Sequence, residues 1–326
     1  MEVILTYFAA LKPAALLRAC PGGIAQGLIW GIMALGVFMT FRMLNIADMT
    51  VDGSFATGGA VCIMLVLKGW NPQAALLASC LAGALAGTVT GLLHTRLGIP
   101  DILAGILTQI SLYSINLNIM GKANQSVNVA KVSFYFTNNV RLLTRTILIS
   151  AVCCAAMVAV IHWYLGTQHG SALRATGANE KMARAQGINT DRMKVIGLAL
   201  GDALVGLSGG ILSQFQGYAD VNMGRGAIVI GLAAVIIGEV LGQAFLRKRF
   251  NLLLQLVFVI VGAIVYYLVY VFVIWLKFPA DDMKLLTAVV VAIFLAVPYL
   301  KDHSKNSFRH LAKQNAKLQR EEAPHA

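Results

Sequence analysis

Long apolar stretches alternate with short polar intervals along almost the whole chain. A helix needs roughly 20 apolar residues to cross a bilayer, so a chain of 326 residues has room for about ten spans at most. The pattern predicts an all-α polytopic bundle of about nine transmembrane helices, with eight and ten as the bounds. The predicted spans cover residues 22–41, 54–67, 74–93, 102–120, 146–165, 195–215, 227–245, 252–276 and 285–300.

Composition supports a membrane protein. Only 12% of the residues are charged, about half of the roughly 25% typical of soluble domains, and the mean hydropathy is +0.74. The net charge of +12 is spread over predicted loops and the C-terminal tail. Basic residues placed in this way favour contact with membrane lipid at the cytoplasmic face and do not indicate nucleic-acid binding.

The pattern divides the chain into three regions. Residues 1–21 are expected to form an interfacial segment, because Lys12 and Pro13 interrupt their short apolar run. Residues 22–300 form the transmembrane domain, and residues 301–326 form a basic tail at the cytoplasmic lipid surface. Alternation of nine spans then places the interval 166–194 in the cytoplasm and the N-terminus outside, although the basic residues of 121–145 disagree. If residues 3–17 also span, the N-terminus moves inside.

The polar interval 166–194 has the sequence features of a short capped helix over about 178–187. The helix would start near Gly177, and Asn179 can cap its N-terminus. Glu180 and Arg184 can pair across one turn, and Gly187 can end the helix in a left-handed conformation. A capped helix with a small apolar stripe at the membrane surface suits docking of a soluble partner. The alternative is an ordinary cytoplasmic loop that is helical.

The second predicted span follows an interval, NIADMTVDGSF, that contains Asp48 and Asp52. In one interpretation Asp52 or Ser54 only caps the helix that follows. In the other, the helix is broken inside the membrane and its exposed amides line a substrate cavity. The residues leave both interpretations open.

Two further carboxylates fall inside predicted spans. A charge at mid-membrane costs about 2.5 to 3.5 kcal/mol on the insertion scale, so each needs a reason. Asp202, in the sixth span, either hydrogen-bonds to a neighbouring helix or lines a pathway. Glu239, in the seventh, can pair with Arg42 at the same depth.

Polar residues also interrupt the fourth span. Thr108, Ser111 and Ser114 recur every three residues and predict one polar stripe, facing either a water-filled pathway or a neighbouring helix. The same span also contains Gln109, Asn116 and Asn118.

The sequence contains no recognisable catalytic or metal site. It has no GxxxxGK[ST] nucleotide-binding loop, no GxSxG elbow, and no metal-ligand spacing among its histidines and cysteines. We therefore expect no catalytic residue, no metal ligand and no cofactor in this chain.

The loop and the helix after it resemble ABC importer permeases of the branched-chain amino acid and ribose type. The similar segment reads GANEKMARAQGINTDRMKVIGLALGDALVGLSGGI, and the segment GLIWGIMALGVFMTFRMLNIADMTVDGSFATGGA resembles the first span and broken second helix of that family. The resemblance runs from about residue 22 to 300 and departs at ADMTVDGSF, where better-known members are nearer to INFAHGE. The loop positions that match are Gly177, Asn179, Ala183, Gly187, Ile188, Arg192 and Lys194.

The resemblance implies a mechanism and partners. Two permease chains would form a pathway in the bacterial inner membrane, and two cytoplasmic ATPases, which hold ATP and Mg²⁺, would bind the loop helix. An extracytoplasmic binding protein would deliver a small solute, with an amino acid favoured. The residues expected to couple to the ATPase are Gly177, Asn179, Glu180, Ala183, Gly187 and Arg192.

Two other functions remain open from the sequence. The chain could be a secondary transporter or channel that works alone, in which case it would move solute in liposomes without an ATPase. A weaker alternative is an intramembrane enzyme that uses Asp202 or Glu239.

Overall fold

The computed structural model describes residues 13–127, 143–246 and 251–276, together with isolated positions between and after these ranges. Helices account for nearly all of them, which confirms the all-α class. In chain order the elements are α2 (Pro13–Val37), the π-helix η1 (Phe38–Met43), α3 (Val51–Leu67), α4 (Pro72–Arg96), α5 (Asp101–Met120), β1 (Asn124–Ser126), α6 (Leu143–Gly166), α7 (Gln168–Ala178), α8 (Glu180–Ala185), α9 (Thr190–Gln216), β2 (Tyr218–Asp220), α10 (Ala227–Leu246) and α11 (Leu252–Trp275).

Seven of the helices in the described residues are long and apolar enough to cross a bilayer, and α3 is a shorter apolar helix of 17 residues. The first eight predicted spans fall on these eight helices. Most of the ninth, 285–300, lies outside the described residues, as do the tail 301–326 and most of the segment 1–21. The count of nine is therefore not confirmed.

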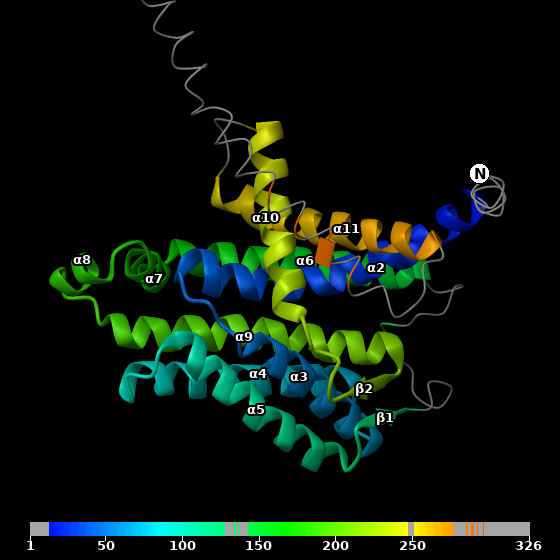
Figure 1. The fold of residues 1–326 in the computed structure, drawn as a ribbon, viewed down its shortest axis with the longest axis horizontal. Coiled ribbons are helices and arrows are strands. Elements are labelled where there is room, and N and C mark those ends of the chain that lie inside the picture. The colour runs from blue at the N-terminus through cyan, green and yellow to red at the C-terminus, as the bar shows by residue number, and fades with distance from the viewer. Residues whose placement is uncertain are drawn as a thin grey trace, which may run out of the picture.

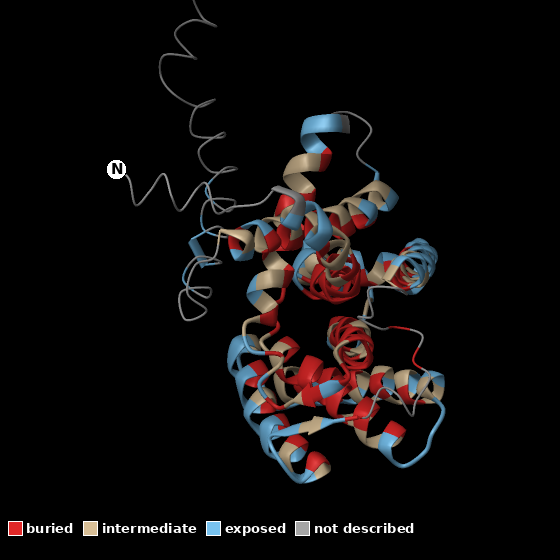
Figure 2. Cartoon of the chain, turned by 90° about the vertical axis from the view of Figure 1, so that its right-hand side faces the viewer, coloured by how far each residue is buried: buried red, intermediate tan, exposed pale blue. Residues whose placement is uncertain are grey.

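Helix α9 runs through the middle of the bundle, between α2 on one side and α3 and α4 on the other (Figure 1). Helices α6 and α11 pack against α2, α5 packs against α3 and α4, and α10 crosses the direction of the other long helices. In Figure 2 the buried residues gather at the centre of the bundle, while the outer helix faces are exposed.

Glycines set the close approach of α4 to α9. A Cβ on Gly91 would lie 2.8 Å from the Val195 Cα, and a Cβ on Gly87 would meet the Leu198 carbonyl. Apolar burial gives no drive for association between helices in lipid, so small residues that let backbones approach are the usual solution. Gly87 and Gly91, four residues apart on α4, therefore form a close helix–helix contact with α9.

The chain breaks between α2 and α3. Helix α2 ends in the π-turns of η1, and residues 44–50 then run without regular structure to α3, with Asn45 at a φ of 56°. Since α3 rises about 1.5 Å per residue, its 17 residues are shorter than a full span. An irregular stretch followed by a short apolar helix therefore stands where the sequence predicted a broken second helix. We call residues 44–50 the broken-helix junction.

Two short strands were not predicted. Strand β1 pairs antiparallel with β2, with Gln125 opposite Ala219. The pair joins the segment after α5 to the segment between α9 and α10. It lies at the end of the bundle opposite to α7 and α8 (Figure 1).

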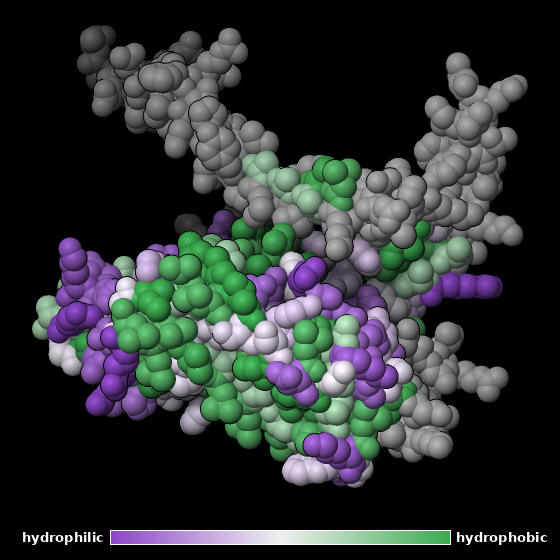
Figure 3. Space-filling model, turned by 60° about the horizontal axis from the view of Figure 1, so that its bottom comes forward, coloured by the Kyte–Doolittle hydropathy of each residue, from purple (hydrophilic) through white to green (hydrophobic). Residues whose placement is uncertain are grey.

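The outer surface is apolar over α4 and α5. Leu77, Leu81 and Leu85, spaced one turn apart on α4, are each about two-thirds exposed. Figure 3 shows a broad hydrophobic face bounded by hydrophilic residues at the α8 end. Such a face suits contact with lipid, so the exposed leucines are expected in a transmembrane bundle.

Candidate functional site

Helix α8 has the caps that the sequence predicts. The Asn179 side-chain oxygen accepts a hydrogen bond from the Met182 N–H at 3.0 Å. Gly187, at a φ of 81°, donates to Arg184 O, and Ile188 donates to Ala183 O, which together form a Schellman ending. The helix is thereby fixed at both ends, although it covers only 180–185 of the predicted 178–187.

An ionic network ties α8 to the first turns of α9. The Glu180 carboxylate accepts from Arg184 at 3.1 Å, as predicted, and from Lys194 at 2.9 Å. Arg184 also donates to the Thr190 hydroxyl at 2.8 Å and reaches Asp191 at 3.2 Å. The Lys194 hydrogen bond lowers the pKa of the Glu180 carboxyl, and the nearby Arg184 charge acts in the same direction. Helix α8 is therefore linked to α9 by several hydrogen bonds and ion pairs.

Gly177 was predicted at the start of the docking helix, and that placement is wrong. It lies near the end of α7, where a Cβ would collide with the Met43 carbonyl and the Leu44 backbone. The Leu44 side chain in turn fills the space that Gly197 of α9 leaves open. Gly177 thus lets α7 sit directly against the broken-helix junction.

The surface of α8 differs from the one that the matched positions suggested. Ala183 is only 3% exposed, so its side chain holds α8 against the bundle instead of facing a partner. Met182 is 63% exposed, and Lys181 and Ala185 are exposed beside it. Arg192 lies in the first turn of α9, where its N–H donates to the capping Asn189 and its side chain is exposed.

Asp52 neither caps α3 nor simply marks a break in the helix, which were the two interpretations of the sequence. It does not cap α3, and neither does Ser54, whose hydroxyl is buried without a hydrogen-bond partner. Instead the Asp52 carboxylate accepts from the Gly226 N–H at 2.9 Å and the Ile228 N–H at 3.0 Å. A carboxylate at the beginning of α3 thereby caps the beginning of α10, which is favourable because helix N-termini carry partial positive charge.

Two other acidic residues, Asp48 and Asp202, are buried in the bundle. Asp48 is 3% exposed, with one oxygen accepting from the Thr50 N–H at 2.9 Å and the other without a partner. Asp202 of α9 is fully buried, and neither oxygen has a hydrogen-bond partner among the described residues. Asp48 is close enough to influence Asp202 electrostatically, and Ser54 lies near Asp202 without a well-aligned hydrogen bond. Hydrogen bonding of Asp202 to a neighbouring helix, one of the two expectations, is not observed in the part of the chain that the structure describes.

Threonines connect the broken-helix junction to α4 and α5. The Thr50 and Thr90 hydroxyls are 2.7 Å apart, and Thr90 donates to Thr108 at 2.9 Å. Thr108 is therefore an interhelical contact. Ser111 is exposed and donates to its own helix at Leu107 O, and Ser114 is exposed too, so the predicted single stripe is wrong. Three-residue steps on an α-helix drift by about 60°, which separates these faces.

The predicted pair of Arg42 and Glu239 is confirmed. Arg42 Nε and Glu239 Oε1 are 2.8 Å apart, linking η1 to α10. The Glu239 side chain is 19% exposed and that of Arg42 is 53% exposed. The pair therefore lies at the edge of the bundle and not at its centre.

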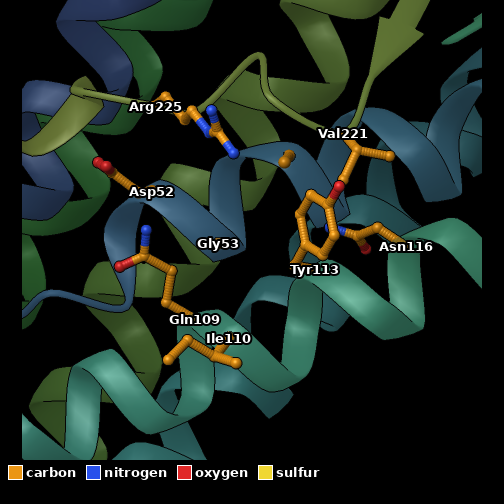
Figure 4. Close-up of a pocket in the computed structure, with 9 residues that line it drawn as sticks. Asp52, Gly53, Gln109, Ile110, Tyr113, Asn116, Val221 and Arg225 are labelled. Carbon is orange, nitrogen blue, oxygen red and sulfur yellow. The ribbon is translucent and has the colours of Figure 1, made fainter. Parts of the chain in front are cut away.

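A pocket of about 240 Å³ opens between α3, α5 and the segment that joins β2 to α10 (Figure 4). Six residues were predicted as pathway-lining or intramembrane polar groups, and among them Asp52 lines this pocket in the described part of the chain, whereas Asp48, Thr108, Ser111, Asp202 and Glu239 do not. Arg225 was not predicted as a site residue, although its charge in a short interval between spans was an available signal. The lining residues are Asp52, Gly53, Ala56, Gln109, Ile110, Tyr113, Asn116, Val221 and Arg225.

Comparison with known proteins shows which family this chain belongs to. Residues 21–298 match the family model of the branched-chain amino acid transport system permease component. The chain belongs to this family of ABC importer permeases. The permease is accordingly a multi-pass protein of the inner membrane, and its bundle forms the translocation pathway of an importer.

Curated relatives agree. The permease is 36% identical to the tyrosine transport system permease protein of Clostridioides difficile over 293 residues, which cover 90% of the permease and 93% of the relative. It is 24% identical to the galactofuranose transporter permease protein YtfT of Escherichia coli over 82% of its own length and 75% of the relative's. It is 27% identical to the ribose import permease protein RbsC of E. coli, over 64% of each chain. No solved structure matches significantly.

Proposed function

We propose that two copies of this permease form the pathway of an amino-acid importer whose ATPase subunits dock on the exposed face of α8 from the cytoplasm. An extracytoplasmic binding protein would deliver the solute at the opposite end, near β1 and β2. The amino-acid substrate is supported by the likeness to a tyrosine transport permease, which covers nearly the full length of both chains.

The physical link from α8 to the membrane-embedded break carries the proposal. Helix α8 is bonded to α9 through Glu180, Arg184 and Lys194. Helix α7, which precedes it, packs on the broken-helix junction through Gly177. A push on α8 therefore reaches both the central helix and the junction beside the pocket. Such a link has little use in a transporter that works without an external motor.

ATP and Mg²⁺ would bind to the ATPase subunits and not to this chain. The sequence has no GxxxxGK[ST] loop, which supports this assignment. The permease would thus supply the pathway and the docking surface, and no catalytic group or metal ligand. Anionic lipid would contact the basic tail 301–326.

A charge on the docking face tests the proposal. Met182→Glu should weaken ATPase binding by at least tenfold, because it places a charge in an apolar contact while leaving the fold intact. Gln168→Glu, which adds the same charge to an exposed position of α7, is the matched control. Co-purification of the ATPase and ATP-driven uptake in proteoliposomes are the measurements.

Ala183→Asp separates docking from folding. Because Ala183 is buried, this change should lower the melting temperature of the isolated permease, whereas Met182→Glu should not. Normal ATPase binding by Met182→Glu would contradict the docking face. Solute movement by the purified chain alone would favour the stand-alone transporter instead.

A further inference from the structure

We propose that the pocket between α3, α5 and the β2–α10 segment binds the solute during passage, and that it selects a zwitterionic α-amino acid whose planar side chain ends in a hydrogen-bonding group. The inference rests on the proposed function, since it names the solute class for the same pathway. The volume of about 240 Å³ is below the roughly 300–1,000 Å³ of sites for drug-sized ligands, which fits a small solute.

Opposite charges line one part of the pocket. The Arg225 guanidinium makes no hydrogen bond or ion pair with any residue that the structure describes, and it extends over the start of α3 on the side away from the Asp52 carboxylate (Figure 4). A free guanidinium matches a carboxylate with two parallel hydrogen bonds. Asp52 already accepts two backbone N–H groups, but each oxygen has a second lone pair for an ammonium donor. This part of the pocket therefore complements a zwitterion.

An amide with no partner lies farther along α5. Asn116 is 1% exposed and lines the pocket, yet neither its side-chain nitrogen nor its oxygen has a hydrogen-bond partner in the described residues. Buried polar groups are nearly always satisfied, so this amide calls for a missing partner. It can donate and accept, which matches a hydroxyl group that does both.

The spacing of the two ends fits one molecule. Gln109 lies beside Asp52 and Gly53, because a Cβ on Gly53 would be 3.1 Å from the Gln109 Cα. Asn116 follows seven residues later, about 10 Å along the axis of α5 at 1.5 Å per residue. A charged head, a six-membered ring and a polar tip together span about this length.

The wall between the two ends is apolar and partly aromatic. Ile110, Tyr113, Ala56 and Val221 form it, with Tyr113 one turn before Asn116 on α5 (Figure 4). Tyr113 is 42% exposed, so its ring is open to an incoming group. An aromatic ring is the natural neighbour for another ring, in an offset or edge-on arrangement. The pocket thus presents charged groups at one end, an aromatic ring in the middle and the Asn116 amide at the other end.

The test uses uptake of labelled tyrosine and phenylalanine by the complete importer in proteoliposomes. Asn116→Leu should lower the ratio of tyrosine to phenylalanine uptake by about tenfold, because a site that hydrogen-bonds a hydroxyl discriminates against the analogue that lacks it. Asn118→Leu, on the same helix but exposed and outside the pocket, should leave the ratio unchanged. Arg225→Gln should lower uptake of both amino acids at least tenfold.

Tyr113→Leu keeps the inference testable if Asn116→Leu does not assemble, and it should raise the KM for both amino acids at least threefold. An unchanged ratio in Asn116→Leu, or an unchanged KM in Tyr113→Leu, would overturn the pocket while leaving the importer intact. A wild-type complex that takes up only sugars would instead overturn the amino-acid substrate itself, and the pocket assignment with it.

Discussion

The surface loop of α7 and α8 and the broken-helix junction both depend on polar side chains, but they find their partners over very different distances in sequence. Glu180 bonds to Lys194, 14 residues away. At the junction Thr50 bonds to Thr90, 40 residues away, and Asp52 bonds to Ile228, 176 residues away. The loop is built locally, whereas the junction exists only when the whole bundle has assembled.

Solvent explains why the two regions respond differently to change. Water competes with every ion pair of the loop, so each contributes little to stability. No water replaces a lost partner inside the bundle, so a polar group left alone there is costly. We therefore expect large effects at the junction and small ones in the loop.

The largest effect should come from breaking the contact between the two regions. Gly177→Ala places a Cβ on the Met43 carbonyl, which should cost about 3 kcal/mol, the upper part of the range for overpacking. Transport should be lost with it. Gly166→Ala, at a position where a Cβ meets nothing within 4 Å, is the control. Thermal unfolding in detergent measures both, and equal melting temperatures would show that α7 does not rest on the junction.

Removing the charge of Asp52 should have the next largest effect. Asp52→Asn replaces one acceptor oxygen by a donor that faces a backbone N–H, which should cost about 2 kcal/mol. The control is Asp220→Asn, since Asp220 also accepts from a backbone N–H, that of Asn222 at 2.7 Å, through a hydrogen bond that is exposed to solvent. Unfolding of the two variants compares part-buried hydrogen bonds with an exposed one, and equal losses would contradict the role assigned to burial.

The effect of breaking the pair of Arg42 and Glu239 should be smaller than the effects at the junction and larger than those in the loop. A double-mutant cycle with Arg42→Met and Glu239→Gln should give a coupling of about 1 kcal/mol, because one partner is largely buried and the other is half exposed. A parallel cycle on Arg184 and Asp191, both exposed, should give a coupling near zero. Additive effects at Arg42 and Glu239 would show that their contact carries no energy.

The smallest effect should be the response of the loop to pH. The lowered pKa of Glu180 means that its contribution is fully present above the ordinary carboxylate pKa and is lost as the pH falls through the lowered value. Its size should stay under about 1 kcal/mol, since the side chain is 40% exposed. The protection factors of the α8 amides in hydrogen exchange should therefore fall below about pH 4, and less so in Glu180→Gln. The same acid response in both proteins would exclude Glu180 as its source.

The sequence allowed prediction where partners are near in the chain. The Asn179 cap, the Glu180–Arg184 pair and the left-handed Gly187 depend on spacings of three to seven residues, and all three are confirmed. The Arg42–Glu239 pair was predicted from equal membrane depth, which hydropathy also reveals.

Prediction was wrong where the answer depends on packing. In one of the two interpretations Asp52 or Ser54 caps α3, but Asp52 instead caps α10, whose terminus lies beside it only in the folded bundle. Ala183 was expected on the docking face because its position matches a family motif, yet its side chain is buried. Likewise nothing local distinguishes the buried Asn116 from the exposed Asn118. Which residues of a helix are buried depends on the helices that pack against it.

The π-helix η1 gives the permease a way to change shape by winding instead of bending. Its residues Phe38–Met43 bond five positions apart, one more than in an α-helix. Conversion of η1 to an α-helix would therefore turn Arg42, which pairs with Glu239, and Met43, which contacts Gly177, about the helix axis relative to Val37. The extra residue of the π-turn would in this way allow movement of α8 at the surface to cause rotation of a helix inside the bundle.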